Sequence, residues 1–263
     1  ELDDRKTDNH NLPNLFEERE KLLVGDFKNE KSSDKISIGL PRGLMNYYQL
    51  FPFWKSFFSE LGFNLIISDE SDRKIITESL ETMVSETCLP VELIHGHVLN
   101  LISKKVDFVF VPFIVNSQGG KDNPTNNCNC PWVQSHPYLL KAAFTGKNIN
   151  DKLLMPTLHF RYFERVLKKE LSTFFASKFN LRKSAILKAI DNANNAQKQF
   201  EQNIKIKGRE TLKNLDENRW NIVILGRPYN TGDPALNLRI NKKLQNMNVL
   251  AIPLDHLPLE EEY

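Results

Sequence analysis

The chain carries three cysteines, and all of them lie in short polar loops. Cys88 lies two residues before Pro90, and Cys130 is followed directly by Pro131, so each stands where the sequence predicts the start of a helix. The positive end of a helix dipole stabilises a thiolate, the form of cysteine that binds metals and iron–sulfur clusters. Free cysteines also pack as small apolar side chains, although Asn, Thr and Glu flank these two. The residues alone therefore favour neither a role as metal or cluster ligand nor a role as bystander for these two thiols.

A zinc site is a weaker interpretation of the same loops. Cys128 and Cys130 have one residue between them, whereas zinc-binding pairs usually have two or more, and Cys88 has no second thiol close in sequence. The histidines that could complete a tetrahedral site are His95, His97 and His136. Because His95 and His97 are two apart on a predicted helix, their side chains point in different directions. We therefore expect capping or packing roles for them.

Two arginines follow predicted strands, where a guanidinium could hold a phosphate or a carboxylate. Arg42 comes after the strand predicted at 35–40, and Arg227 comes after the strand predicted at 221–226. Either could equally pair with a neighbouring acid. The sequence has neither the G-x-x-x-x-G-K-S/T spacing of a nucleotide phosphate loop nor the G-x-G-x-x-G spacing of a dinucleotide site. A sheet-edge site for a small phosphorylated or CoA ligand therefore depends on these two arginines.

Strands that alternate with helices must position these loops. Apolar and β-branched runs predict strands at 35–40, 63–68, 106–115, 221–226 and 249–253. Apolar residues at helical spacing predict helices within 1–34 and at 45–61, 75–84, 91–103, 131–143 and 236–246. This alternation indicates an α/β fold with a Rossmann-like parallel sheet and helices on both faces. In such sheets, ligands bind beyond the carboxyl ends of the strands.

Residues 181–215 interrupt the alternation. Their apolar stripe steps by three and four along one helix face and includes Ile186, Ile190, Ala193, Gln197, Phe200 and Ile204. We expect a long helix that lies across its own sheet or pairs with 162–179, in preference to a coiled coil between chains. We divide the chain into a linker with a docking helix (1–34), a first Rossmann-like unit (35–143), a helical insert (144–219) and the start of a second, truncated α/β unit (220–263).

Composition excludes several classes of protein. The 263 residues include 35 Lys and Arg against 33 Asp and Glu, a net charge of +2, which gives no basic field for nucleic acid. No apolar run approaches the roughly 20 residues of a membrane helix, and we expect a cytoplasmic protein without a signal peptide. Three cysteines are too few for a secreted disulfide scaffold.

Several short motifs together resemble one known family. They are residues 38–48 (IGLPRGLMNYY), 51–63, 85–90 (SETCLP), 95–97 (HGH), 130–134, and 226–230 (GRPYN) with Asp233 and Pro234; residues 12–23 resemble the segment that leads into them. The sequence resembles the acyl-CoA dehydratase activase-related family, found beside activator modules of 2-hydroxyglutaryl-CoA dehydratases. The resemblance matches Cys88 and Cys130 to two family cysteines and implies a third beyond this chain, whereas Cys128 takes a position that is not a family cysteine.

The resemblance implies an iron–sulfur protein, with a 4Fe-4S or double-cubane cluster held through Cys88 and Cys130. We expect these two cysteines to face a common cleft, with Cys128 either turned away or a substitute metal ligand. An ATP-dependent activator module, in the same chain or a separate one, would pass an electron to the cluster and on to an acyl-CoA or similar substrate. The alternative is a non-catalytic interaction or scaffold domain that docks the activator. A homodimer is a further possibility that the sequence leaves open. We expect a fragment of a longer protein that holds no intact cluster when isolated in air, because the polar loop around Gly119 and Gly120 leaves the site exposed.

Overall fold

Four short parallel strands form the central sheet of the computed structural model, which describes all residues except 1–11, 31, 33, 118–126, 161–163 and 260–263. The sheet has the order β2-β1-β3-β5, formed by Ser37–Leu40 (β1), Asn64–Ile67 (β2), Phe108–Phe110 (β3) and Leu153–Leu154 (β5). Every residue of β1 is buried, as expected for a strand covered on both faces. The α/β fold with a parallel sheet is therefore confirmed.

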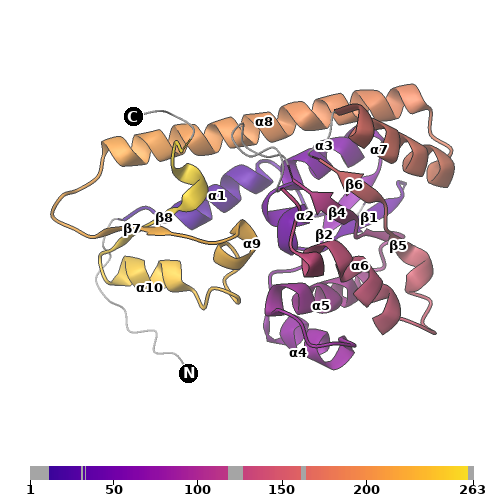
Figure 1. The fold of residues 1–263 in the computed structure, drawn as a ribbon, viewed down its shortest axis with the longest axis horizontal. Coiled ribbons are helices and arrows are strands. Elements are labelled where there is room, and N and C mark those ends of the chain that lie inside the picture. The colour runs from indigo at the N-terminus through magenta and orange to yellow at the C-terminus, as the bar shows by residue number, and fades with distance from the viewer. Residues whose placement is uncertain (1–11, 31, 33, 118–126, 161–163, 260–263) are drawn as a thin grey trace.

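Helices cover both faces of this sheet. In Figure 1, α3 (Phe51–Glu60) lies on one side of the strands, and α4 (Arg73–Thr82) and α5 (Leu89–Ser103) lie on the other. The short helix α2 (Leu44–Tyr48) precedes α3, and the break between them coincides with Pro52 at the start of α3. Aromatic side chains fill the space under α3: Trp54, Phe57, Phe58, Phe110 and Phe175 are all fully buried.

The predicted strand at 106–115 is two strands in two different sheets. β3 lies in the central sheet, whereas β4 (Phe113–Asn116) pairs in parallel with β6 (Thr157–His159) in a second sheet. Each of the two paired segments carries a proline at the junction, Pro112 in one and Pro156 in the other. A proline has no N–H to donate to a β-ladder. The prolines therefore divide one parallel pairing into two short ladders.

The segment 144–219, for which we expected helices alone, also contributes strands. β5 and β6 have two and three residues, and the 3-10 turn η1 (Asn150–Lys152) precedes them. The predicted helices of this segment are α7 (Glu164–Phe179) and α8 (Lys183–Lys213), and they follow β6. Strands this short carry no periodicity of their own and form because β3 and β4 offer them a partner.

The long helix α8 connects the two ends of the molecule (Figure 1). It packs on α3 and α7 at one end and on the turn η2 (Leu254–His256) at the other. The apolar stripe that predicted it is buried at Ile186, Ile190, Ala193, Phe200 and Ile204, and Ala189 is buried beside it. The stripe therefore packs within the chain, as expected.

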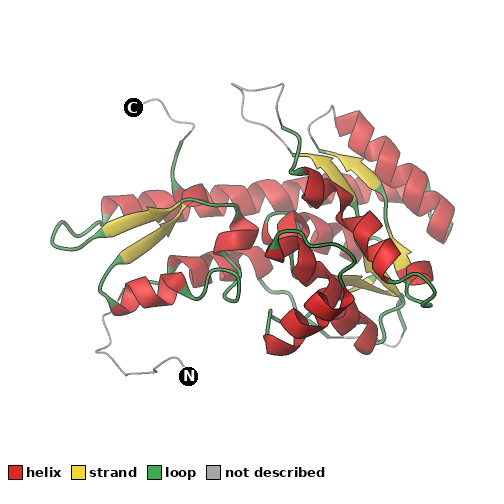
Figure 2. Cartoon of the chain, turned by 60° about the horizontal axis from the view of Figure 1, so that its bottom comes forward, coloured by secondary structure: helices red, strands yellow, loops and turns green. Residues whose placement is uncertain are grey.

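A second, smaller α/β unit begins after α8 (Figure 2). Parallel strands β7 (Asn221–Ile224) and β8 (Leu250–Pro253) are connected through α9 (Pro228–Thr231) and α10 (Ile240–Asn246). The predicted helix at 236–246 begins only at Ile240, because Leu238 and Arg239 take positive φ angles of 52° and 54°. Helix α1 (Leu15–Val24) packs against β8.

Helix α6 (Pro131–Ala143) completes the fold beside α5 and β4. Among the residues that the structure describes, no helix has both the length and the apolar character needed to cross a membrane.

Candidate functional site

Cys88 occupies the N-cap of α5, as the sequence predicts. Its backbone is extended, with φ −82° and ψ 143°, and its side chain makes no capping hydrogen bond. The carboxylate of Glu92 instead holds the loop before the helix, because Glu92 Oε1 accepts from Thr87 N at 2.8 Å. The exposed thiol of Cys88 is therefore not used to cap its own helix.

Cys130 occupies the N-cap of α6, with Pro131 at the first helical position. Asn129 fixes this loop to the end of β4: Asn129 Nδ2 donates to Ile114 O at 2.9 Å, and its Oδ1 accepts from Ser117 Oγ at 2.9 Å. Gln134 Nε2 in turn donates to Asn129 O at 2.6 Å. The residue beside Cys130 is thus buried and hydrogen-bonded, whereas the Cys130 thiol is exposed.

Tyr229 in α9 is the group that relates the two thiols to each other. Burial raises the pKa of its phenol above the ordinary value of 10.0, Arg227 lowers that pKa, and Cys130 and Cys88 both raise it. Both thiols therefore lie close enough to act on one phenol. Cys130, Arg227 and Tyr229 also line one small cavity. The sequence motif at 226–230 thus lies beside the cysteine loops, although nearly a hundred residues separate it from Cys130.

Cys128 has a different setting. It forms an isolated antiparallel bridge with Asn116, at the end of β4. All three cysteines are exposed and unpaired. Across the described part of the chain, no group of three or more His, Cys, Asp or Glu side chains could hold a metal ion. Metal ligation by Cys88, Cys130 and Cys128 stays a prediction.

His95 and His97 are buried, which agrees with the packing roles expected for them, and His136 is buried as well. Burial lowers the pKa of His97 and of His136 to about 4, and it also lowers the pKa of His95. His97 Nδ1 lies 2.9 Å from Ser68 Oγ, and its Nε2 lies 3.1 Å from Ser71 Oγ. These imidazoles are therefore neutral, buried groups at pH 7.

One buried polar chain was not predicted from the sequence. Asp233 Oδ2 accepts from Tyr48 Oη at 3.0 Å and from Ser71 Oγ at 2.5 Å, and Ser71 contacts His97. Its Oδ1 accepts from the backbone N–H of Ala235 at 2.8 Å. Asp233 thereby ties the segment after α9 to α2 and to the loop after β2. Its partners are far apart in sequence, so only the Asp–Pro pair itself signalled a turn.

The two candidate arginines differ in their surroundings. Arg42 NH2 forms ion pairs with Glu20 at 2.8 Å and Glu70 at 3.1 Å, and its guanidinium lies over the Tyr47 ring. Its charge is therefore used within the protein. Arg227 is exposed and, among the described residues, forms no ion pair. Of the two, Arg227 retains the ability to bind an anion.

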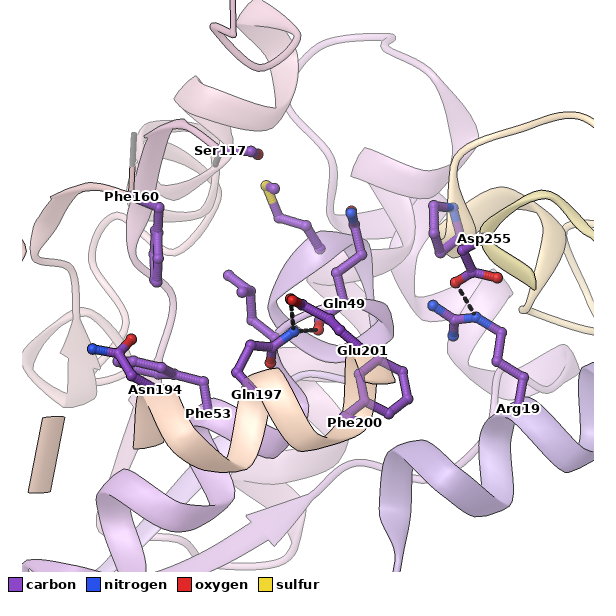
Figure 3. A pocket seen from close by; sticks show the side chains of 13 residues that line it. Arg19, Gln49, Phe53, Ser117, Phe160, Asn194, Gln197, Phe200, Glu201 and Asp255 are labelled. Atoms are coloured by element: carbon purple, nitrogen blue, oxygen red, sulfur yellow. Dashed lines mark hydrogen bonds and ion pairs between the residues drawn. The ribbon is translucent and has the colours of Figure 1, made fainter. Parts of the chain in front are cut away.

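Two larger cavities lie near Arg227. The first, about 230 Å³, lies beyond the ends of β4 and β6, beside Ser117 and Phe160, and α8 forms part of its lining (Figure 3). We name it the carboxyl-end cavity. The second, about 670 Å³, follows the ends of β7 and β8 and includes Arg19, Lys205, Arg227 and Asp255. We name it the basic cavity. Both occupy the position at which ligands bind in parallel sheets.

Comparison with known proteins gives one match. The model of a family described as the CoA enzyme activase uncharacterised domain matches residues 37–257, which include all the motifs around Cys88, Cys130 and Tyr229. The comparisons with curated proteins and with solved structures found no match.

Proposed function

The chain belongs to the CoA enzyme activase uncharacterised domain family, and on that basis we propose that it takes part in ATP-coupled, low-potential electron transfer to an acyl-CoA or a similar substrate. In this proposal, Cys88 and Cys130 are ligands of an iron–sulfur cluster. An ATP-dependent activator, in the same chain or a separate one, is its partner and delivers the electron.

The observation that carries the proposal is the pair of thiols around Tyr229. Cys88 and Cys130 each occupy the N-cap of a helix, and neither side chain makes a capping hydrogen bond. Both thiols raise the pKa of the Tyr229 phenol. Helix N-termini offer backbone N–H groups and a positive dipole end, which favour thiolates and hydrogen bonds to cluster sulfurs.

The donor set fits part of a cluster. A 4Fe-4S cluster takes four thiolates, and Cys88 and Cys130 supply two, with Cys128 as a further candidate. The proposal therefore includes ligands from a second chain or from a segment outside residues 1–263. When bound, such a cluster would accept and release one electron at low potential.

The residues around the thiols have distinct roles in this proposal. Asn129 holds the Cys130 loop against β4, so the thiol is kept in position by hydrogen bonds rather than by the metal alone. Arg227 lines the same small cavity as Cys130 and Tyr229. In this proposal ATP binds to the activator, and the present sequence lacks the spacing of a nucleotide phosphate loop.

Anaerobic reconstitution of the full-length protein with iron and sulfide tests the proposal. We expect stoichiometric iron and sulfide with a sulfide-to-iron charge-transfer band. Cys88→Ser and Cys130→Ser lose that band, and Cys128→Ser distinguishes the two roles of the third thiol, because it keeps the band where Cys128 is turned away and weakens it where Cys128 is a substitute ligand. Iron retained in the Cys88→Ser/Cys130→Ser double variant would contradict the proposal and would favour a scaffold domain.

A further inference from the structure

The carboxyl-end cavity and the basic cavity adjoin each other. They share four lining residues: Arg19, Gln49, Pro228 and Asp255. No cysteine lines either cavity. A ligand that occupies both would therefore lie next to the proposed cluster ligands without contacting them, and its binding does not depend on the iron–sulfur proposal.

The carboxyl-end cavity suits an apolar group. Phe53, Phe160 and Phe200 contribute aromatic walls (Figure 3), and Met45 also lines the cavity with a flexible side chain. The amide nitrogen of Gln197, one of the polar lining residues, is already engaged, because Gln197 Nε2 donates to Gln49 O at 3.0 Å and to Glu201 Oε1 at 2.9 Å, whereas its buried Oε1 has no hydrogen-bond partner among the described residues. An apolar occupant therefore gains contact with the rings and breaks no hydrogen bond of this amide.

The basic cavity suits an anion. Its charged lining residues in the described part of the chain are Arg19, Lys205, Arg227 and Asp255, three bases and one acid. Asp255 Oδ2 accepts from Arg19 Nε at 2.7 Å, so the single acid is already paired. Arg227 lines the cavity, is exposed and takes part in no ion pair between described residues. A planar guanidinium in that position can hold a phosphate or a carboxylate through two hydrogen bonds.

We propose that the two cavities together bind an amphipathic anion. The ligand has a phosphate or carboxylate head, which contacts Arg227 in the basic cavity, and an apolar chain, which lies against Phe53, Phe160 and Phe200 in the carboxyl-end cavity. The head group of the ligand joins its apolar tail at the shared wall formed by Pro228 and Gln49. This arrangement places the ligand between the ends of β4 and β6 and the ends of β7 and β8.

Isothermal titration calorimetry with defined probes tests this site on the intact chain. Hexyl phosphate is compared with inorganic phosphate, which has no chain, and with 1-hexanol, which has no charge. We expect hexyl phosphate to bind at least tenfold tighter than either. Hexanoate identifies the head group: whichever of hexyl phosphate and hexanoate binds tighter contains the preferred anion, and both results support the proposal.

Arg227→Met is the variant that tests the head contact, because this side chain is exposed and its loss leaves the core intact. Arg73→Met, at an exposed arginine of α4 that lines neither cavity, is the matched control. We expect Arg227→Met to weaken hexyl phosphate binding at least tenfold and Arg73→Met to leave it unchanged. Equal binding of hexyl phosphate and inorganic phosphate, or unchanged binding by Arg227→Met, would overturn the proposal.

Discussion

Acid should destabilise this protein well above the pH at which carboxylates titrate, because two of its histidines are buried and neutral. Burial lowers the pKa of His97 and His136 from the ordinary value of 6.5 to about 4. In the unfolded chain these imidazoles bind a proton below pH 6.5, whereas in the folded protein they stay neutral until about pH 4. Their contribution to stability is therefore complete above pH 6.5 and is lost as the pH falls towards 4.

The size of the effect at pH 5.5 follows from the unfolded state. At pH 5.5 an unfolded histidine is mostly protonated and a buried, folded one is not. This difference lowers the free energy of unfolding by about 1.4 kcal/mol for each histidine. That figure holds for any folded pKa below about 5, so it does not depend on the exact shift. Both histidines together should cost roughly 3 kcal/mol, and His95, whose pKa burial also lowers, acts in the same direction.

The matched variants lie on α6, the helix that Cys130 begins. His136→Leu keeps the approximate volume and removes the titrating group, together with the contact of His136 Nδ1 to Val133 O at 2.7 Å. Val133→Ala removes buried apolar volume close by and no titrating group. Urea denaturation, followed by circular dichroism, gives the free energy of unfolding at pH 7.5 and pH 5.5.

We expect the wild type and Val133→Ala to lose the same stability between the two pH values, and His136→Leu to lose about 1.4 kcal/mol less. An equal loss in His136→Leu and the wild type would refute the reasoning. It would mean that His136 titrates in the folded protein as freely as in the unfolded chain.

Three further outcomes follow from the contacts between the units and from the open thiols. Gly208→Ala would place a methyl group onto the His256 carbonyl oxygen, and overpacking of about 1–3 kcal/mol should exceed the gain of about 1 kcal/mol in helix propensity; a stabilised variant in urea denaturation would contradict this. Arg19→Met removes the donors to Asp255 Oδ2 and Tyr48 O and should cost about 1–3 kcal/mol of unfolding free energy; an unchanged denaturation midpoint would be incompatible with it. The protein purified in air should carry no intact cluster; near-stoichiometric iron and acid-labile sulfide would show that its own thiols suffice.

Local signals in the sequence predicted most of the first sheet. β1 and β2 are short apolar runs, each followed by a helix, so periodicity and alternation were enough to find them. β5 and β6 were missed, because strands of two and three residues exist only through their pairing with β3 and β4. The division of the strand at 106–115 depended on Pro112 matching Pro156 across the ladder, which is a long-range fact.

The candidate site shows the same boundary between local and long-range information. Proline after each cysteine was enough to place Cys88 and Cys130 at helix N-caps. The approach of Tyr229 could not be predicted, since no pattern relates its position to theirs. Arg42 and Arg227 follow strands in similar motifs, and only the fold distinguishes them. The predicted loop at Gly119 and Gly120 lies outside the described residues.

Anomalous diffraction at the iron edge tests the central claim most directly. Crystals of the full-length protein, reconstituted with iron and sulfide under anaerobic conditions, would show where the metal binds. The account predicts iron peaks bonded to Sγ of both Cys88 and Cys130, beside Tyr229. Iron bound elsewhere, or bonded to only one of these two thiols, would contradict it.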